Sequence, residues 1–144
     1  RRLFLGGVEI PYEYGLLGHS DADVLIHAIC DAVLGALGKG DIGEHFPDTD
    51  DRYKDISSLK LLEEVVRLMR AEAFVIGNVD VVVLAQEPNL KQFKSEMART
   101  LAGILGTETA AVNIKATTNE GMGYIGRREG IACYATVSLS RKDS

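Results

Sequence analysis

The segment from residue 24 to residue 37 most constrains how this chain folds, because it is apolar enough to be buried on nearly every side. Its sequence, VLIHAICDAVLGAL, is typical of a helix that packs inside a domain. Asp23, His27 and Asp31 follow at intervals of four residues, so a helix would place them on one face. Such groups are costly to bury unless they are paired. The segment therefore predicts a buried helix whose polar face meets a metal ion, a cationic partner or a polar cleft.

The start of this helix carries a second signal. Ser20 and Asp23 match a capping box, in which the serine caps the helix and the aspartate reaches back. Within the helix, His27 is a candidate metal ligand, and the alternative is a core histidine bonded to a carbonyl. One histidine does not make a zinc site, since protein zinc needs three or four ligands. We expect Asp23 and Asp31 to orient the imidazole rather than to bind the metal themselves.

Hydrophobic periodicity predicts the remaining elements. Expected are a hairpin over residues 1–10, helices over about 57–72 and after Pro88, and strands over 74–86, 112–116 and 131–139. This order predicts one α+β domain over residues 1–144, a single-layer mixed β-sheet with helices packed on one face. The other face of such a sheet needs cover, which oligomerisation usually supplies.

Composition excludes several classes of protein. The formal net charge of −5 argues against a nucleic-acid-binding surface, which needs clustered Lys and Arg. No apolar run approaches the roughly 20 residues of a membrane span, so no membrane partner is expected. Cys30 and Cys133 lie in apolar runs without metal-ligand spacing, which favours free thiols in a reducing compartment. We expect a cytoplasmic protein, or a plastid one if a transit peptide has been removed.

Three polar segments interrupt the elements. Residues 39–56 form a long acidic loop without the spacing of an EF-hand, and on composition alone a solvated loop is the better interpretation. Residues 121–126 match G-x-G-x-x-G, but a strand follows instead of a helix, which excludes a dinucleotide site. Residues 117–120 offer hydroxyls and a carboxylate near Arg127, which suits phosphate and Mg²⁺, although a polar turn is the alternative. Residues 85–90 are interpreted as a connection between the predicted strand over 74–86 and the helix after Pro88.

Taken together, these segments carry a recognisable set of motifs: GHSDAD at 18–23 with His27, GDIG at 40–43, FPDTD at 46–50, GNVD at 77–80, AQ at 85–86 with Pro88, NIKATT at 113–118 with Glu120, Arg127, and EGIA at 129–132. In this order they resemble the 2-C-methyl-D-erythritol 2,4-cyclodiphosphate synthase family of the non-mevalonate isoprenoid pathway. The resemblance covers almost the whole chain.

The resemblance implies a homotrimer with sites between neighbouring subunits, each holding Zn²⁺ (or another divalent transition metal) and Mg²⁺ or Mn²⁺. The small-molecule substrate would be 4-diphosphocytidyl-2-C-methyl-D-erythritol 2-phosphate, cyclised with release of CMP by a phosphorus–oxygen lyase. The resemblance also assigns roles: His19 and Thr118 as catalytic residues; His27 and Glu120 as metal ligands; and Ser20, Asp41, Ile42, Gly43, Phe46, Pro47, Asp48, Thr49, Asp50, Ala85, Gln86, Pro88, Asn89, Leu90, Lys91, Thr117, Asn119, Glu120, Tyr124 and Arg127 as substrate-binding residues.

The family's other zinc ligands lie in an Asp-x-His motif, which would precede Arg1. The domain is thus expected to lack its N-terminal strand and that metal-binding segment. Two alternatives to a separate cyclase remain open. One is a non-catalytic trimeric protein that binds an isoprenoid diphosphate through Arg127. The other is the C-terminal half of a bifunctional cytidylyltransferase/cyclase.

Overall fold

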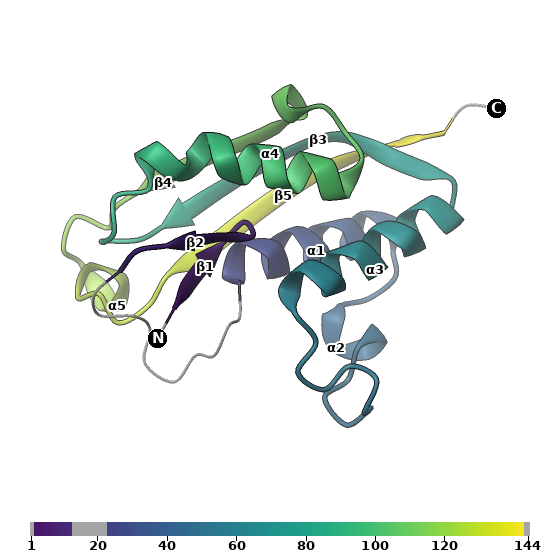
Figure 1. Ribbon diagram of the computed structural model, residues 1–144, viewed down its shortest axis with the longest axis horizontal. Helices are drawn as coiled ribbons and strands as arrows, with labels where there is room; N and C mark the ends of the chain where they lie inside the picture. The colour runs from purple at the N-terminus through teal and green to yellow at the C-terminus, as the bar shows by residue number, and fades with distance from the viewer. Residues whose placement is uncertain (1, 13–22, 143–144) are drawn as a thin grey trace.

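The computed structural model describes residues 2–12 and 23–142. A three-stranded mixed sheet runs the length of the molecule (Figure 1). Its central strand is β3 (Phe74–Leu84), which pairs in parallel with β4 (Val112–Thr117) and antiparallel with β5 (Ala132–Arg141). Because β3 and β4 are parallel, their carboxyl ends meet at one end of the sheet, where Leu84 lies beside Thr117. The polar segments that follow both strands therefore start from the same place.

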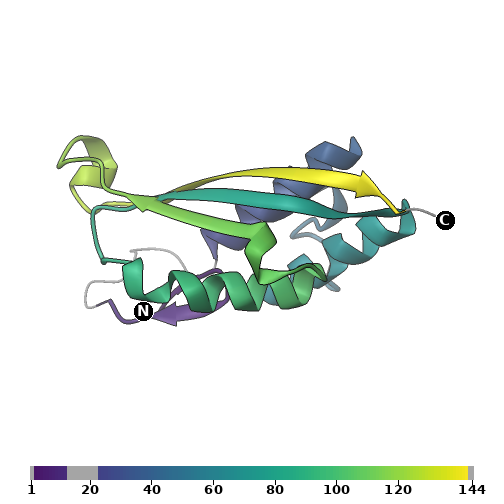
Figure 2. The same cartoon turned by 90° about the horizontal axis from the view of Figure 1, so that it is seen from above.

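Three long helices supply the layer that covers this sheet: α1 (Val24–Leu37), α3 (Ser58–Ala71) and α4 (Lys94–Leu105). The burial of β3 alternates, since Val79, Val81 and Val83 are fully buried whereas Asp80 and Val82 between them are partly exposed. Figure 2 shows α4 and the N-terminal hairpin on one side of the sheet. The predicted α+β fold with helices on one sheet face is confirmed.

The N-terminal hairpin is also as predicted. It joins β1 (Leu3–Leu5) to β2 (Val8–Ile10) through Gly6 and Gly7. Both glycines have positive φ, 61° and 79°, which a two-residue hairpin turn requires and other residues rarely adopt. A Cβ atom on Gly6 would lie 3.0 Å from Met97 of α4, so this turn is also packed closely against the helix layer.

Short elements occupy the predicted loops. They are α2 (Ile42–His45), the 3₁₀ helices η1 (Lys91–Phe93) and η2 (Thr109–Ala111), and α5 (Gly123–Gly126). Residues 39–56 are thus partly ordered by α2 and by turns rather than forming an unstructured loop. No helix among residues 2–12 and 23–142 is long and apolar enough to cross a membrane.

The predicted capping box at the start of α1 is wrong in its geometry. The N-cap is Asp23 itself, in an extended conformation, and its side chain accepts a hydrogen bond from the N–H of Ile26. A carboxylate in this position satisfies one of the free N–H groups of the first turn. Ser20, the predicted cap, lies outside the described residues.

Candidate functional site

The carboxylate of Asp23 is a structural junction. It is 1% exposed and accepts three backbone N–H donors: Gly6 at 3.0 Å, Gly7 at 2.8 Å and Ile26 at 3.0 Å. Burial raises the pKa of this carboxyl, although the three donors and nearby His27 act in the opposite direction. Asp23 therefore joins the hairpin turn to the start of α1.

The imidazole of His27 meets a hydroxyl rather than a carboxylate. Its Nε2 lies 3.4 Å from Oγ of Ser58, the first residue of α3. Asp31 is exposed, and its carboxylate accepts from the N–H of Ile42 at 3.2 Å. The prediction that Asp23 and Asp31 orient the imidazole is therefore wrong. Asp23, as the N-cap, turns away from the helix face, and Asp31 is bonded to the segment that follows the helix.

Residues 41–50 continue from this helix. Asp41 caps α2 by accepting from the N–H of Glu44, and Gly43 and Glu44 are exposed. Phe46 is buried, with its ring edge-on to Tyr53 at 5.1 Å. Arg52 hydrogen-bonds the Asp50 carboxylate and holds its pKa below the ordinary value. The polar members of the predicted substrate-binding set in this segment are accessible, whereas Phe46 belongs to the core. The set comprises Asp41, Ile42, Gly43, Phe46, Pro47, Asp48, Thr49 and Asp50.

A second group of predicted residues gathers at the carboxyl ends of β3 and β4. The N–H of Ala85 donates to the carbonyl of Thr117 at 3.0 Å, which continues the strand pairing past Leu84. Oε1 of Gln86 accepts from the N–H of Gly121 at 3.0 Å, and Glu87 forms an ion pair with Arg128 at 3.3 Å. The segments 85–91 and 117–128 are thus held together.

Within the second segment, most side chains are exposed and bonded locally. The hydroxyl of Thr118 accepts from the N–H of Glu120 at 3.3 Å, and the amide of Asn119 donates to the carbonyl of Met122 at 2.8 Å. Arg127 pairs with Glu129 at 2.8 Å, which lowers the pKa of the Glu129 carboxyl. An exposed hydroxyl, carboxylate and guanidinium on one loop could bind phosphate groups and a divalent cation.

The predicted site residues therefore form two groups in one chain. The first, here called the α1 group, comprises His27 with residues 41–50, linked by the contacts of Asp31 with Ile42 and of Ser58 with His27. The second, here called the strand-end group, comprises residues 85–91 and 117–127. Figure 1 shows α5 at one end of the molecule and α2 well away from it. A single chain does not bring the two groups together.

The two candidate metal ligands are of suitable chemical types, an imidazole and a carboxylate. Residues 2–12 and 23–142 contain no group of three or more His, Cys, Asp or Glu side chains that could hold a metal ion. His27 and Glu120 lie in different groups, so neither completes a site with the described side chains of its own chain. The predicted residues His19 and Ser20 lie outside the described residues.

The two cysteines do not belong to the candidate site. Burial raises the pKa of both thiols, Cys30 and Cys133, to about 12, so neither is an activated nucleophile.

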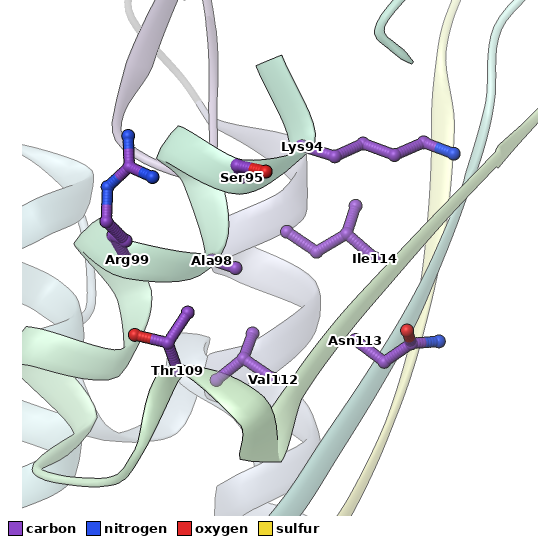
Figure 3. Close-up of a pocket in the computed structure, with 8 residues that line it drawn as sticks. All are labelled: Lys94, Ser95, Ala98, Arg99, Thr109, Val112, Asn113 and Ile114. Atoms are coloured by element: carbon purple, nitrogen blue, oxygen red, sulfur yellow. The ribbon is translucent and has the colours of Figure 1, made fainter. Parts of the chain in front are cut away.

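An open groove of about 480 Å³ lies between α4 and β4 (Figure 3). Lys94, Ala98 and Arg99 of α4 and Ile114 of β4 are among the residues that line it. No predicted site residue lines this groove.

Sequence reasoning missed Ser58. The pair Ser57-Ser58 reads as an ordinary helix start, and Ser57 does cap α3 by accepting from the N–H of Lys60 at 3.2 Å. The sequence signal that could have indicated Ser58 is the second serine of the pair, because one serine is enough to cap the helix.

Comparison with known proteins places these groups in context. Residues 1–140 match the model of the YgbB family. The 2-C-methyl-D-erythritol 2,4-cyclodiphosphate synthase of Syntrophotalea carbinolica is 56% identical over 98% of this chain and 86% of its own length. The structure of the bifunctional IspDF from Campylobacter jejuni superimposes with a TM-score of 0.91 at 45% identity. That match covers 98% of this chain and 38% of the bifunctional one. A structure described as the same synthase in a CDP-bound form gives a TM-score of 0.89 at 32% identity, covering 97% of this chain and 91% of that one.

Proposed function

The chain belongs to the YgbB family, and on that premise we propose that it is a 2-C-methyl-D-erythritol 2,4-cyclodiphosphate synthase. It converts 4-diphosphocytidyl-2-C-methyl-D-erythritol 2-phosphate to the cyclic diphosphate and releases CMP. The observation that carries this conclusion is the match over residues 1–140, which includes every motif segment from 18–23 to 129–132.

The reaction is an intramolecular phosphoryl transfer. An oxygen of the 2-phosphate attacks the β-phosphorus, a new P–O bond closes the ring, and the bond to CMP breaks with its electron pair on the departing oxygen. The nucleophile is already an anion, so no strong general base is needed, and the barrier is mainly one of positioning and charge. This fits a site that offers hydroxyls, an imidazole and a guanidinium.

The strand-end group binds the nucleotide end of the substrate. Residues 85–91 hold cytosine, and the Gln86–Gly121 hydrogen bond keeps this segment beside residues 117–120. The hydroxyl of Thr118 accepts from Glu120, so its own hydrogen can be donated to a phosphate oxygen in the transition state. His19 is assigned to the same transition state from the family resemblance, and residues 41–50 hold the methylerythritol portion.

The enzyme is a metal-dependent lyase. His27 would be one ligand of a zinc-type ion and Glu120 one ligand of Mg²⁺ or Mn²⁺, with the remaining ligands supplied from outside the described residues. Bound divalent cations would align the phosphates and offset their negative charge.

The complete site forms between copies of the chain in a homotrimer. The separation of the α1 group from the strand-end group supports this arrangement, since the α1 group of one copy can face the strand-end group of the next. Met122 and Tyr124 of the strand-end group and Tyr134 of β5 are also exposed, at 63%, 55% and 66%. Exposed large apolar side chains of this kind are consistent with an interface.

A fused enzyme is the second candidate. The bifunctional enzyme IspD/IspF of Desulfotalea psychrophila is 54% identical over 98% of this chain, which spans 36% of that protein. The separate synthases match as well or better over most of their own length, so the monofunctional enzyme is the better supported proposal.

The test is CMP release from the diphosphocytidyl substrate by the natural full-length protein with Zn²⁺ and Mg²⁺. We expect turnover by the wild type, and a loss of about 100-fold in Thr118→Ala, which removes one transition-state donor. Thr109→Ala removes an exposed hydroxyl of η2 and serves as the matched control. An assembled, metal-loaded wild type that releases no CMP would overturn the proposal and favour the diphosphate-binding alternative.

A further inference from the structure

The hydroxyl of Ser58 lies between the start of α1 and the ring of His27. Its Oγ accepts from the N–H of Asp23 at 3.2 Å and lies 3.4 Å from Nε2 of His27. Ser58 is the first residue of α3, but it does not cap that helix, because Ser57 already does so. The Ser58 hydroxyl therefore joins α3 to the N–H of Asp23 and also faces the imidazole of His27.

The groups around this hydroxyl are linked by several hydrogen bonds. The N–H that it accepts belongs to Asp23, whose carboxylate is fixed by Gly6, Gly7 and Ile26. His27 follows one turn later, and its own N–H donates to the carbonyl of Asp23 at 3.0 Å. The backbone N–H of His27 and the Ser58 oxygen that faces its ring are thus both hydrogen-bonded to the backbone of Asp23. A hydrogen bond from the ring to this oxygen restricts the rotation of the imidazole.

A serine oxygen has two acceptor lone pairs. One receives the Asp23 N–H, and the other can receive a proton carried by Nε2 of His27. Histidines that bind metals commonly donate their second ring N–H to a fixed acceptor, which sets the tautomer and the direction of the ligating nitrogen. Here neither neighbouring carboxylate is that acceptor, because Asp23 and Asp31 are bonded to backbone groups elsewhere.

We propose that Ser58 is a positioning residue that holds the neutral imidazole of His27 in the tautomer protonated at Nε2, leaving the Nδ1 lone pair for a ligand. The inference rests on the proposed function only in taking that ligand to be the zinc-type ion. It assigns Ser58 no contact with the substrate. Loss of the hydroxyl frees the ring and its tautomer without removing the ligand itself.

The first measurement is the tautomer of His27 in the metal-free full-length protein, read from ¹⁵N chemical shifts of both ring nitrogens at about pH 8, above the ordinary histidine pKa of about 6.5. We expect the proton on Nε2 in the wild type and a mixture of tautomers in Ser58→Ala. A wild-type ring protonated mainly at Nδ1 would overturn the proposal without any variant, so the test does not depend on the folding of Ser58→Ala.

The second measurement is the affinity for Zn²⁺, by competition with a chromophoric chelator. Ser58→Ala is expected to bind Zn²⁺ about 10-fold more weakly, as for the loss of an outer hydrogen-bond partner, and Ser58→Thr, which keeps the hydroxyl, to restore both readouts. Ser57→Ala is the matched control, since it removes the neighbouring cap and lowers Tm but leaves the tautomer and the affinity unchanged. Equal losses in Ser57→Ala and Ser58→Ala would show a merely structural role. A wild type that shows the expected tautomer but releases no CMP would refute the proposed function and leave the role of Ser58 standing.

Discussion

Asp23 and the loop 117–130 present polar groups in opposite ways. The Asp23 carboxylate is buried and accepts three backbone N–H groups from two parts of the chain. In the loop, Thr118, Glu120 and Arg127 are exposed; the Thr118 hydroxyl bonds to the N–H of Glu120, and Arg127 pairs with Glu129 two residues away. The hydrogen bonds of Asp23 thus connect parts of the fold, whereas the polar groups of the loop remain accessible. In this chain Asp23, which was predicted to orient the candidate metal ligand His27, instead joins the hairpin to α1.

The largest effect on stability is expected for Asp23→Ala. The substitution leaves the N–H groups of Gly6, Gly7 and Ile26 without an acceptor, and each buried unsatisfied group costs about 1–3 kcal/mol. We expect the free energy of unfolding to fall by about 3 kcal/mol or more and Tm to fall by about 10 °C. Thermal and urea unfolding measure this change. A loss below about 1 kcal/mol, the typical value for an N-cap alone, would show that the hairpin does not depend on this carboxylate.

The pH dependence of stability examines the same carboxyl. Burial raises the pKa of Asp23 above 3.8, so the folded state holds the proton more tightly than the unfolded chain does. Its contribution to stability is then fully present below pH 3.8 and is lost as the pH rises through the folded-state pKa. The stability of the wild type relative to Asp23→Asn should therefore fall as the pH rises through that window. A relative stability that rises instead would show that the three N–H donors outweigh burial.

The sequence predicted the elements well but the partners of Asp23 poorly, and the reason is physical. Periodicity places Val79, Val81 and Val83 in the core because alternation follows directly from strand geometry. The four-residue spacing of Asp23 and His27 assumes helical geometry at both positions, and Asp23 is extended, with φ −97° and ψ 99°. Its partners lie 16 and 17 residues away in another element, and no local pattern encodes such a contact.

In the candidate site, too, contacts between distant parts of the chain were not predicted. The two segments of the strand-end group were assigned specific roles only through the family resemblance, and their proximity follows from the parallel pairing of β3 and β4, which brings Leu84 beside Thr117. The contact of Ser58 with His27 was not predicted, since it joins residues 31 positions apart through the packing of α3 against α1. Short-range chemistry can be inferred from motif spacing, whereas the residue that orients a motif side chain depends on tertiary structure.

In the exposed loop, Thr118→Ala should separate activity from stability. Among the described residues its hydroxyl bonds to the N–H of Glu120, so we expect a small change in Tm but a fall in kcat of about 100-fold, the usual effect of removing one transition-state donor. Steady-state CMP release and thermal unfolding of the same samples provide both values. A parallel loss of Tm and kcat, comparable to that in Asp23→Ala, would remove the distinction between the two regions.

Gln86→Ala is expected to give an intermediate effect. It removes the hydrogen bond to the N–H of Gly121 that holds the two strand-end segments together. A net loss of about 1 kcal/mol, the typical worth of such a bond, corresponds to about a five-fold change in an equilibrium. We therefore expect KM for the diphosphocytidyl substrate to rise about five-fold with little change in kcat. Gln92→Ala, at an exposed position of η1, is the matched control and should leave KM unchanged.

The smallest effect on stability is expected for Glu129→Gln. The Arg127–Glu129 pair is exposed on both sides, and exposed ion pairs contribute little because solvent screens them. The hydrogen bond from Arg127 lowers the pKa of Glu129 below 4.5, so its contribution is present above that pH and is lost as the pH falls through the folded-state pKa. Near neutral pH we expect Tm of Glu129→Gln to match the wild type. NMR titration should show the Glu129 carboxyl returning to its ordinary pKa in Arg127→Ala. A fall in Tm as large as that of Asp23→Ala would mean that the pair is buried in the assembled protein, and the exposed loop would then share the structural role of the Asp23 carboxylate.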